Sequence, residues 1–331
     1  KPESALNENL MEQYNNNILG VTRQFAYSTK NNNTIDMVLT INGIPVVALE
    51  LKNQYKGQNV DNAINQFKYD RDPKEFCFRF NHRFLVYFAV DLYEASMTTC
   101  LQGGATYFMP FNQGSNGAGK DGGKGNPANP NGYPTSYLWE DVLQKDSALD
   151  IIQKFIHNKD NKTLIFPRFH QLDVVRKLIA DVRKNGTGHN YLIQHSAGSG
   201  KTNSIAWLAH RLTSLHDADN KIIFDNIIIV TDRVVVDRQL QEAVLSMEHK
   251  PGLIKVMDDK CAAVDLADAL NSNTKIIVTT IHKFLYIHDL VGEMKSKKFA
   301  VIIDEAHSST AGSEMEAVTY ALSESRKLSD A

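Results

Sequence analysis

The chain has 331 residues, 42% of them hydrophobic and 22% charged, which is the composition of a globular protein with more than one domain. Its formal net charge of −2 excludes a general electrostatic attraction to DNA, so any contact with nucleic acid has to come from local patches. No apolar run approaches the roughly 18 residues that span a bilayer, so we expect no membrane association.

The first pattern with a chemical meaning is a pair of strands predicted at residues 35–53, IDMVLTINGIPVVALELKN. The strands meet at Asn42-Gly43, a dipeptide that is typical of two-residue hairpin turns. They carry Asp36, Glu50 and Lys52 in the spacing D-x13-E-x-K. Because side chains alternate along a strand, Glu50 and Lys52 should share one face, while the intervening leucine points into the core.

These three residues suggest a nuclease site. Asp36 beside Glu50 would form a carboxylate pair able to bind Mg²⁺, and Lys52 would stabilise charge on a phosphate or help to activate water. We therefore predict Asp36, Glu50 and Lys52 as catalytic residues, with the two carboxylates as metal ligands. The alternative is a surface hairpin with an exposed salt bridge.

The stretch NAINQFKYDRD at residues 62–72 resembles the Q-x-x-x-Y helix that accompanies the PD-(D/E)xK nuclease core in one family of motors. This resemblance adds Gln66 to the predicted catalytic set. The stretch departs from the family pattern at Tyr69, which follows Gln66 by three residues rather than four.

Residues 112–134 are rich in glycine, asparagine and proline and are predicted to form a mobile loop. The loop is either a flexible connector or a segment whose Lys120 and Lys124 contact nucleic acid or a neighbouring domain. Strands dominate before it, whereas strands and helices alternate after it. We therefore predict two domains, at residues 1–150 and 151–331.

A nucleotide site is predicted at residues 194–212, QHSAGSGKTNSIAWLAHRL. The stretch fits the P-loop pattern G-x-x-x-x-G-K-[ST], except that His195 stands at the first glycine. Residues 191–194, YLIQ, are predicted to be a buried strand, and a helix is predicted after the lysine. Upstream, Gln171 of FPRFHQ offers both a donor and an acceptor to adenine.

A glycine-rich turn before a helix presents backbone N–H groups to phosphate oxygens. In such a turn Lys201 would reach the β- and γ-phosphates, and the Thr202 hydroxyl would bind Mg²⁺. The alternative is a helix start that contains GSGKT by chance. The residues predicted to bind the nucleotide are Ser196, Ala197, Gly198, Ser199, Gly200, Lys201 and Thr202.

Three β-branched runs predict buried parallel strands at residues 226–233, 274–284 and 299–304. The last run leads into Asp304-Glu305-Ala306-His307. In an open α/β sheet, ligand chemistry lies at the carboxyl ends of the strands. We predict that Asp304 holds Mg²⁺, directly or through water, and that Glu305 orients and deprotonates the attacking water.

GSGKT followed by DEAH resembles the first motor domain of superfamily two helicases and translocases, a family that often lacks the leading P-loop glycine. TDRVVVDRQL at residues 231–240 resembles the next conserved segment, whose strand end contacts the nucleic-acid backbone, and TTIHKF at 279–284 resembles the one after it. The resemblance implies ATP and Mg²⁺ as cofactors. The predicted fold class is thus α/β, with a PD-(D/E)xK nuclease-like domain followed by a RecA-like P-loop domain with a parallel sheet.

A nuclease core followed by a DEAH motor in one chain resembles the restriction (R) subunit of type I restriction–modification enzymes. The resemblance also covers RQFAYS, NPNGYPTSYLWE and FPRFHQLDVVRKL. It implies ATP-driven translocation of double-stranded DNA, cleavage away from the recognition site, and specificity and modification (methyltransferase) subunits as partners. It implies a bacterial or archaeal cytoplasm, which three widely spaced cysteines fit as reduced thiols.

The sequence contains no second motor domain, which would supply an arginine finger, so we interpret the chain as a fragment that is inactive as a motor by itself. Two other functions stay open. One is a DNA-repair or antiphage helicase whose nuclease-like half is only a platform. The other is a nucleotide-gated, non-enzymatic assembly subunit.

Overall fold

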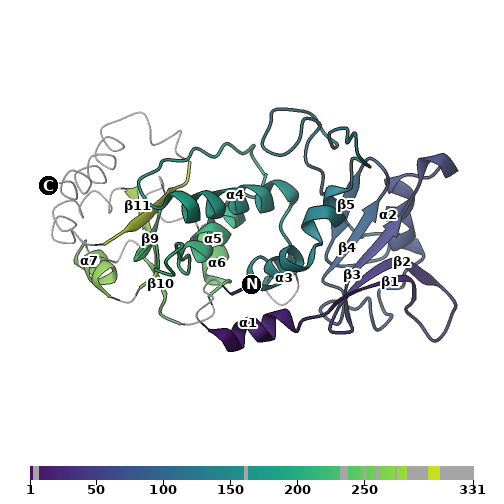
Figure 1. The fold of residues 1–331 in the computed structure, drawn as a ribbon, viewed down its shortest axis with the longest axis horizontal. Helices are drawn as coiled ribbons and strands as arrows, with labels where there is room; N and C mark the ends of the chain where they lie inside the picture. Colours follow the sequence, from purple (N-terminus) through teal and green to yellow (C-terminus); the bar gives the residue numbers. More distant parts are fainter. Residues whose placement is uncertain are drawn as a thin grey trace. The chain divides into compact units, whose positions relative to one another are not determined.

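The computed structural model describes residues 1–2, 7–159, 163–231, 238–248, 251–257, 261, 263–272, 274–281 and 297–305 (Figure 1). The chain divides into two compact units, Lys1–Val174 and Val175–Ala331, each described here by itself. The sequence-based domains divide earlier, at residues 150 and 151. Residues after that point pack in the first unit, since the Phe166 ring lies 6.0 Å from Phe88 and 6.2 Å from Phe111.

The first unit is built around a six-stranded sheet with the strand order β1-β2-β3-β4-β5-β6. All neighbouring strands are antiparallel except β3 and β4, which are parallel. A separate two-stranded sheet consists of β7 and β8. The elements are α1 (Glu8–Asn15), β1 (Leu19–Ala26), β2 (Thr34–Ile41), β3 (Ile44–Leu51), α2 (Val60–Tyr69), β4 (Val86–Val90), β5 (Ala95–Thr98), β6 (Met109–Pro110), α3 (Lys145–Lys154), β7 (His157–Lys159) and β8 (Thr163–Ile165), with a 3-10 turn at Gln54–Lys56 and a π turn at Leu138–Val142.

The hairpin of β2 and β3 is formed as its sequence predicts. Its turn residues Asn42 and Gly43 have φ angles of 51° and 83°, the left-handed backbone that a two-residue turn of this kind requires. Farther from the turn, Leu39 pairs with Val47 after a shift in register, which leaves Val46 without a partner on β2. This extra residue is a β-bulge in β3.

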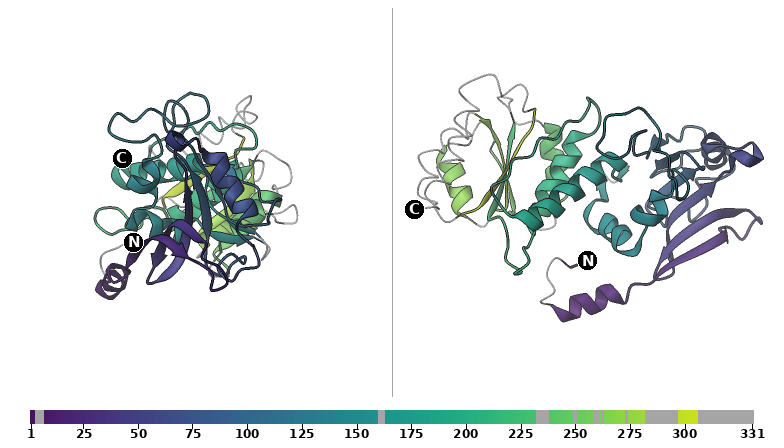
Figure 2. Two further views of the ribbon diagram at one scale, coloured as in Figure 1. Left: turned by 90° about the vertical axis from the view of Figure 1, so that its right-hand side faces the viewer. Right: turned by 45° about the horizontal axis from the view of Figure 1, so that its top comes forward.

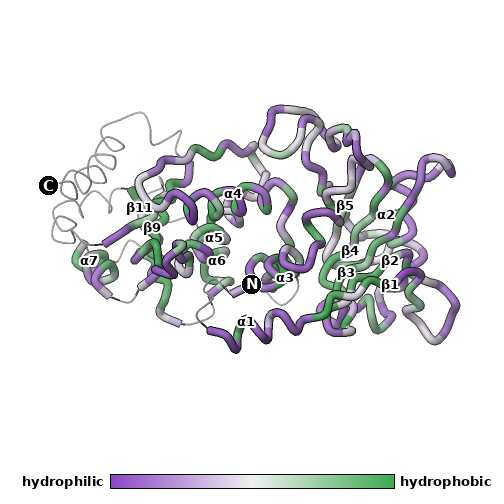
Figure 3. The backbone as a smooth tube through the Cα atoms, viewed as in Figure 1, coloured by the Kyte–Doolittle hydropathy of each residue, from purple (hydrophilic) through white to green (hydrophobic). Residues whose placement is uncertain are grey.

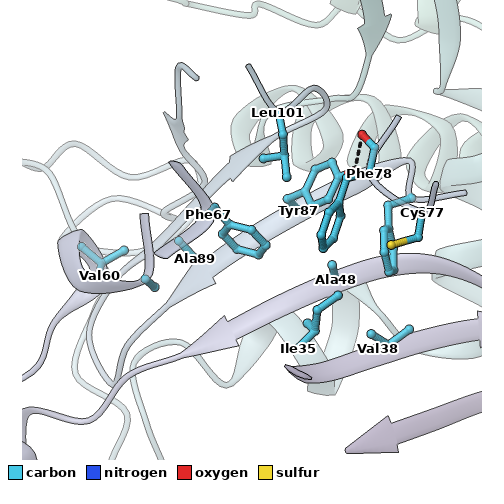
Figure 4. Packing of buried hydrophobic residues seen from close by; sticks show 12 residues of the cluster. Ile35, Val38, Ala48, Val60, Phe67, Cys77, Phe78, Tyr87, Ala89 and Leu101 are labelled. Carbon is cyan, nitrogen blue, oxygen red and sulfur yellow. Dashed lines mark hydrogen bonds between the residues drawn. The ribbon is translucent and has the colours of Figure 1, made fainter. Parts of the chain in front are cut away.

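One face of the sheet is covered by α2 and carries a hydrophobic core cluster of the first unit (Figure 4). The fully buried ring of Phe67 on α2 lies 5.6 Å from Tyr87 of β4 and 5.8 Å from Phe108. Ala48 of β3 belongs to this core, and alternation along the strand turns Glu50 to the same face. The other buried members are Ile35, Val38, Val60, Ala63, Cys77, Phe78, Phe84, Ala89 and Leu101.

The loop at residues 112–134 contains no helix or strand, but its backbone closes on itself. The N–H of Gly114 donates to the carbonyl of Gly125, and that of Ser115 donates to the carbonyl of Gly123. These bonds draw the two arms of the loop together. The mobility expected from its composition stays a prediction.

The second unit contains a parallel sheet with the strand order β10-β11-β9-β12. The strands of this unit, in green to yellow, are seen in the right-hand view of Figure 2. Every residue of β9 and β11 is buried, as the β-branched runs predict, and Figure 3 shows hydrophobic stretches in both strands. Among the described residues, no helix has both the length and the apolar character needed to cross a bilayer. The elements are α4 (Phe169–Asn185, which crosses from the first unit), α5 (Lys201–Leu212), β9 (Asn226–Thr231), α6 (Arg238–Leu245), β10 (Ile254–Val256), α7 (Ala263–Asn271), β11 (Ile276–Thr280) and β12 (Phe299–Ile303).

The prediction of a buried strand at residues 191–194 is wrong for this structure. The segment has no regular secondary structure, and Leu192 is 90% exposed. The Tyr191 hydroxyl donates to Oδ2 of Asp181 on α4 at 2.6 Å, which holds the start of the segment at the surface. So short an apolar run has no periodicity by which a buried strand is distinguished from an exposed connection.

Candidate functional site

Asp36 and Glu50 come from neighbouring antiparallel strands of the first unit. Met37 pairs with Leu49, so Asp36 and Glu50 form the next opposed positions, with side chains on one face. Glu50 is fully buried, whereas 27% of the Asp36 side chain is exposed. Oδ2 of Asp36 accepts a hydrogen bond of 2.8 Å from the N–H of Leu51, which fixes this carboxylate at the end of the hairpin.

Lys52 and Gln66 complete the group that the sequence singles out. The Nζ of Lys52 lies 3.8 Å from Oδ2 of Asp36 and donates to Oε1 of Gln66 at 2.5 Å. Gln66 lies on α2, so the helix that covers the core also places an amide beside the lysine. The structure thus brings together Asp36, Glu50, Lys52 and Gln66, which we call the nuclease cluster.

One expectation about this hairpin is wrong. Leu51, expected in the core, is 39% exposed, while Glu50 is the buried residue of the triplet. Leu51 faces away from Glu50, on the same side of β3 as Leu49, which is 4% exposed. Leu51 is exposed because it is the last residue of the strand.

Arg71 joins the cluster and was missed by the sequence reasoning. It follows the end of α2 and is 4% exposed. Its Nε and Nη2 donate to Oε1 of Glu50 at 3.0 and 2.6 Å, and Nη2 also donates to the carbonyl of Thr34 at 2.8 Å. A buried arginine needs such partners, but no spacing in the sequence shows which arginine is buried.

The electrostatics of the cluster centre on Glu50. Burial raises the pKa of Glu50 to about 7; the positive charge of Arg71 opposes this rise, and the negative charge of Asp36 adds to it. A hydrogen bond between the carboxyl groups of Glu50 and Asp36 also raises this pKa. No other described residue donates a hydrogen bond to the second, buried oxygen of Glu50, Oε2. Such an oxygen beside a second carboxylate fits the oxygen-ligand chemistry of Mg²⁺.

The described residues contain no group of three or more His, Cys, Asp and Glu that could hold a metal ion. A cation bound at Asp36 and Glu50 would therefore complete its shell with water and with oxygens of a phosphate. Mg²⁺ commonly binds in this way, through one or two carboxylates together with substrate phosphates.

In the second unit, the glycine-rich loop has the backbone of a phosphate cradle. Gly198 and Gly200 have φ angles of 71° and 85°, which only glycine adopts at little cost. Gly200 is the N-cap of α5, and no side chain caps the helix there. The first N–H groups of α5, beginning at Lys201 and Thr202, therefore point toward the place where an anion would bind.

The acidic pair lies beside this loop. The Nζ of Lys201 donates to Oε1 of Glu305 at 2.7 Å, and this hydrogen bond raises the pKa of Lys201. The N–H of Glu305 donates to Oδ1 of Asp304 at 3.0 Å, and the N–H of Asp304 donates to the carbonyl of Val230 on β9 at 2.9 Å. The carboxyl end of β12 thus presents both carboxylates at the start of α5.

For the other residues predicted to bind the nucleotide, the structure gives a position but no contact that tests the prediction. Ser196 lies in the loop, where its carbonyl accepts from the N–H of Ser199 at 3.2 Å. Gln171 is buried in the first unit, where its Oε1 accepts from the N–H of Arg168 at 2.9 Å, so its contact with adenine stays a prediction. Residues 232–237, 282–284 and 306–307, which belong to the conserved segments noted above, lie outside the described residues.

Two family descriptions match the chain. Residues 10–106 match the N terminus of the type I restriction enzyme R protein, and residues 170–329 match the SWI2/SNF2 ATPase. The first match contains the nuclease cluster, and the second contains the glycine-rich loop and the acidic pair. These matches show what each half of the chain is similar to.

Curated relatives match most of the chain. It is 25% identical over 331 residues to the putative type I restriction enzyme MjaVIIIP endonuclease subunit of Methanocaldococcus jannaschii, covering 89% of the chain and 29% of that protein. It is 26% identical over 300 residues to the type I restriction enzyme SauCOLORF180P endonuclease subunit of Staphylococcus aureus, covering 88% of the chain and 29% of that protein. The chain therefore spans less than a third of the length of either relative.

Proposed function

Since this chain joins the N-terminal domain of type I restriction enzyme R proteins to a SWI2/SNF2 ATPase domain, we propose that it works as part of a type I restriction endonuclease subunit. In this role ATP hydrolysis drives translocation along double-stranded DNA, and a Mg²⁺-dependent nuclease site cleaves the DNA away from the recognition site. The observation that carries the nuclease assignment is the buried Oε2 of Glu50, to which no described residue other than Asp36 donates a hydrogen bond.

In the proposed nuclease reaction, Asp36 and Glu50 would hold Mg²⁺, which polarises a phosphoryl oxygen and activates water when bound. Lys52 places its ammonium group within 3.8 Å of Asp36, where it stabilises the charge that develops on the scissile phosphate. Gln66 accepts a hydrogen bond from that ammonium group and so orients it toward the phosphate.

In the proposed motor reaction, the loop from Ser196 to Thr202 binds the phosphates of ATP through backbone N–H groups and through Lys201. Thr202 and Asp304 would hold Mg²⁺, and Glu305 orients and deprotonates the attacking water. The phosphates have to draw Lys201 away from Glu305, to which it donates in this structure. Gln171 is proposed to recognise adenine.

The proposed partners follow from the same relationship. They are double-stranded DNA and the specificity and modification (methyltransferase) subunits, in the cytoplasm of a bacterium or archaeon. The named relatives come from both kinds of organism.

The test compares the native protein with its Asp36→Ala variant in the assembled complex. Unmodified target DNA, ATP and Mg²⁺ are supplied, and strand cleavage and phosphate release are followed together. We expect Asp36→Ala to lose cleavage while phosphate release continues. Asp61→Ala, which removes an exposed carboxylate from the first turn of α2, is the matched control.

Normal cleavage by the Asp36→Ala variant would show that the hairpin has no role in the chemistry. In that case the chain would be better described as a DNA-dependent ATPase whose first half is a structural platform. Absence of any effect of DNA on phosphate release by the native protein would instead point to a nucleotide-gated assembly subunit.

A further inference from the structure

The mechanism above uses Asp36, Glu50, Lys52 and Gln66 but gives no role to Arg71, the buried side chain that donates to Glu50. The guanidinium group is buried and donates two hydrogen bonds to a single oxygen of Glu50, at 2.6 and 3.0 Å. It also lies over the ring of Tyr27, with 5.3 Å between its central carbon and the ring centroid. Arg71 is therefore held in one orientation from two sides.

Arg71 connects the segments that carry the cluster. Besides Glu50 near the end of β3, its Nη2 binds the carbonyl of Thr34, the first residue of β2, two positions before Asp36. Arg71 itself follows α2, the helix that carries Gln66. Hydrogen bonds between charged groups are stronger than neutral ones, and the planar guanidinium group also fixes their direction. One side chain thus sets the relative positions of both strands and the helix.

The choice of oxygen matters for a ligand. Both donors of Arg71 bind Oε1 of Glu50, and no described residue other than Asp36 donates a hydrogen bond to Oε2. Glu50 consequently presents one oxygen, and not two, to whatever binds beside Asp36.

The charges of the cluster also balance. With Glu50 ionised, as a cation ligand must be, Asp36 and Glu50 contribute two negative charges and Lys52 and Arg71 contribute two positive charges, within contacts between 2.6 and 3.8 Å. A divalent cation that enters a neutral cluster gains little net attraction. The phosphate of a bound DNA strand would add the missing negative charge beside Lys52.

We propose that Arg71 is a positioning residue of the nuclease site, which fixes Glu50 as a one-oxygen ligand and makes binding of the divalent cation depend on DNA. This inference rests on the proposed nuclease function. It follows that the site stays without its cation, and therefore inactive, until a DNA strand lies in it.

The test measures Mn²⁺ binding by electron paramagnetic resonance in the native protein, with and without a short DNA duplex and in the absence of ATP. The unsubstituted protein should bind Mn²⁺ at this site only with DNA. Arg71→Gln removes the positive charge and should strengthen DNA-free binding by ~10-fold or more. The same variant should lose cleavage by ~10-fold or more, because Glu50 is no longer held. Arg71→Lys keeps the charge, so its DNA-free binding should stay weak while cleavage still falls.

Arg79→Gln is the matched control, since Arg79 is exposed and its Nε binds only a neighbouring carbonyl, that of Lys74. Unchanged Mn²⁺ binding and cleavage in Arg71→Gln would overturn the proposal. The proposal would also be overturned if Arg71→Gln and Arg71→Lys both lowered the melting temperature and lost Mn²⁺ binding and cleavage to the same extent. Arg71 would then act only on the stability of the protein. If DNA-dependent Mn²⁺ binding survives Asp36→Ala, the nuclease assignment itself fails, whatever Arg71 does.

Discussion

Lys201 and Glu305 are bonded to each other, with 2.7 Å between Nζ and Oε1. These are the residues proposed to bind the terminal phosphates and to activate water. Because a phosphate is a stronger partner for the lysine than a single exposed carboxylate, ATP binding should separate the pair and release Glu305 for its role at the water.

The first prediction follows from this contact. Lys201→Ala in the native protein should abolish DNA-stimulated ATP hydrolysis, and with it cleavage, because no other described ammonium group lies at the start of α5 to meet the phosphates. Phosphate release is measured with and without unmodified target DNA. Lys221→Ala, which removes an exposed lysine of the same unit, should have no effect. Near-native turnover by Lys201→Ala would remove the lysine from the mechanism.

A second prediction separates the two reactions. Lys52→Ala should stop strand cleavage while translocation and ATP hydrolysis continue, because the polar contacts of the Lys52 ammonium group among the described residues are with Asp36 and Gln66 of the nuclease cluster. Displacement of a DNA triplex reports translocation independently of cleavage. Lys56→Ala, at an exposed lysine that ends the 3-10 turn after β3, is the control. Loss of translocation in Lys52→Ala alone would mean that the lysine acts beyond the nuclease.

The third prediction concerns pH. The pKa of Glu50 is raised from 4.5 to about 7, chiefly by burial, so the metal-free folded protein keeps this carboxyl protonated at pH values where the unfolded chain has ionised it. The folded state then binds more protons, and the contribution of Glu50 to stability decreases as pH rises from 4.5 to about 7.

Cation binding should show the opposite trend, because only the ionised carboxylate is a good ligand. The affinity for Mn²⁺ in the presence of DNA should rise as pH increases through about 7 and then level off, with proton release on binding below that value. Calorimetry in buffers with different ionisation enthalpies measures the released protons. A flat profile across this range would show that Glu50 does not take up the cation.

The fourth prediction concerns the core under the nuclease cluster. Phe67→Ala should destabilise the first unit by about 3–5 kcal/mol, because it empties a fully buried site between Tyr87 and Phe108. Differential scanning calorimetry of the native protein reports the transition of this unit. Tyr69→Ala changes a ring on the same helix that is 71% exposed, and it should shift the transition little. Equal effects of the two substitutions would contradict the packing described here.

The sequence predicts the elements whose signals are local. The Asn42-Gly43 turn needs left-handed backbone at both residues, and the β-branched runs predict the buried parallel strands β9 and β11. Arg71 was missed because its role depends on a carboxylate 21 positions away, which no local pattern reveals. The strand expected at residues 191–194 is absent, and here too a contact distant in sequence was missed, since Tyr191 donates to Asp181 on α4.

The bulge at Val46 has a consequence for how the hairpin can change. Next to the two-residue turn, Thr40 pairs with Pro45. If the strands continued in this register without the bulge, Asp36 would lie opposite Leu49. Glu50 would then lie on the other face of the sheet from Asp36. One unpaired residue brings the two carboxylates to the same side. The proposed nuclease site therefore depends on whether the number of residues between Asp36 and Glu50 stays odd or even. Gaining or losing one residue would turn the two carboxylates to opposite faces although all the proposed site residues are still present, whereas a change of two residues would leave them on the same face.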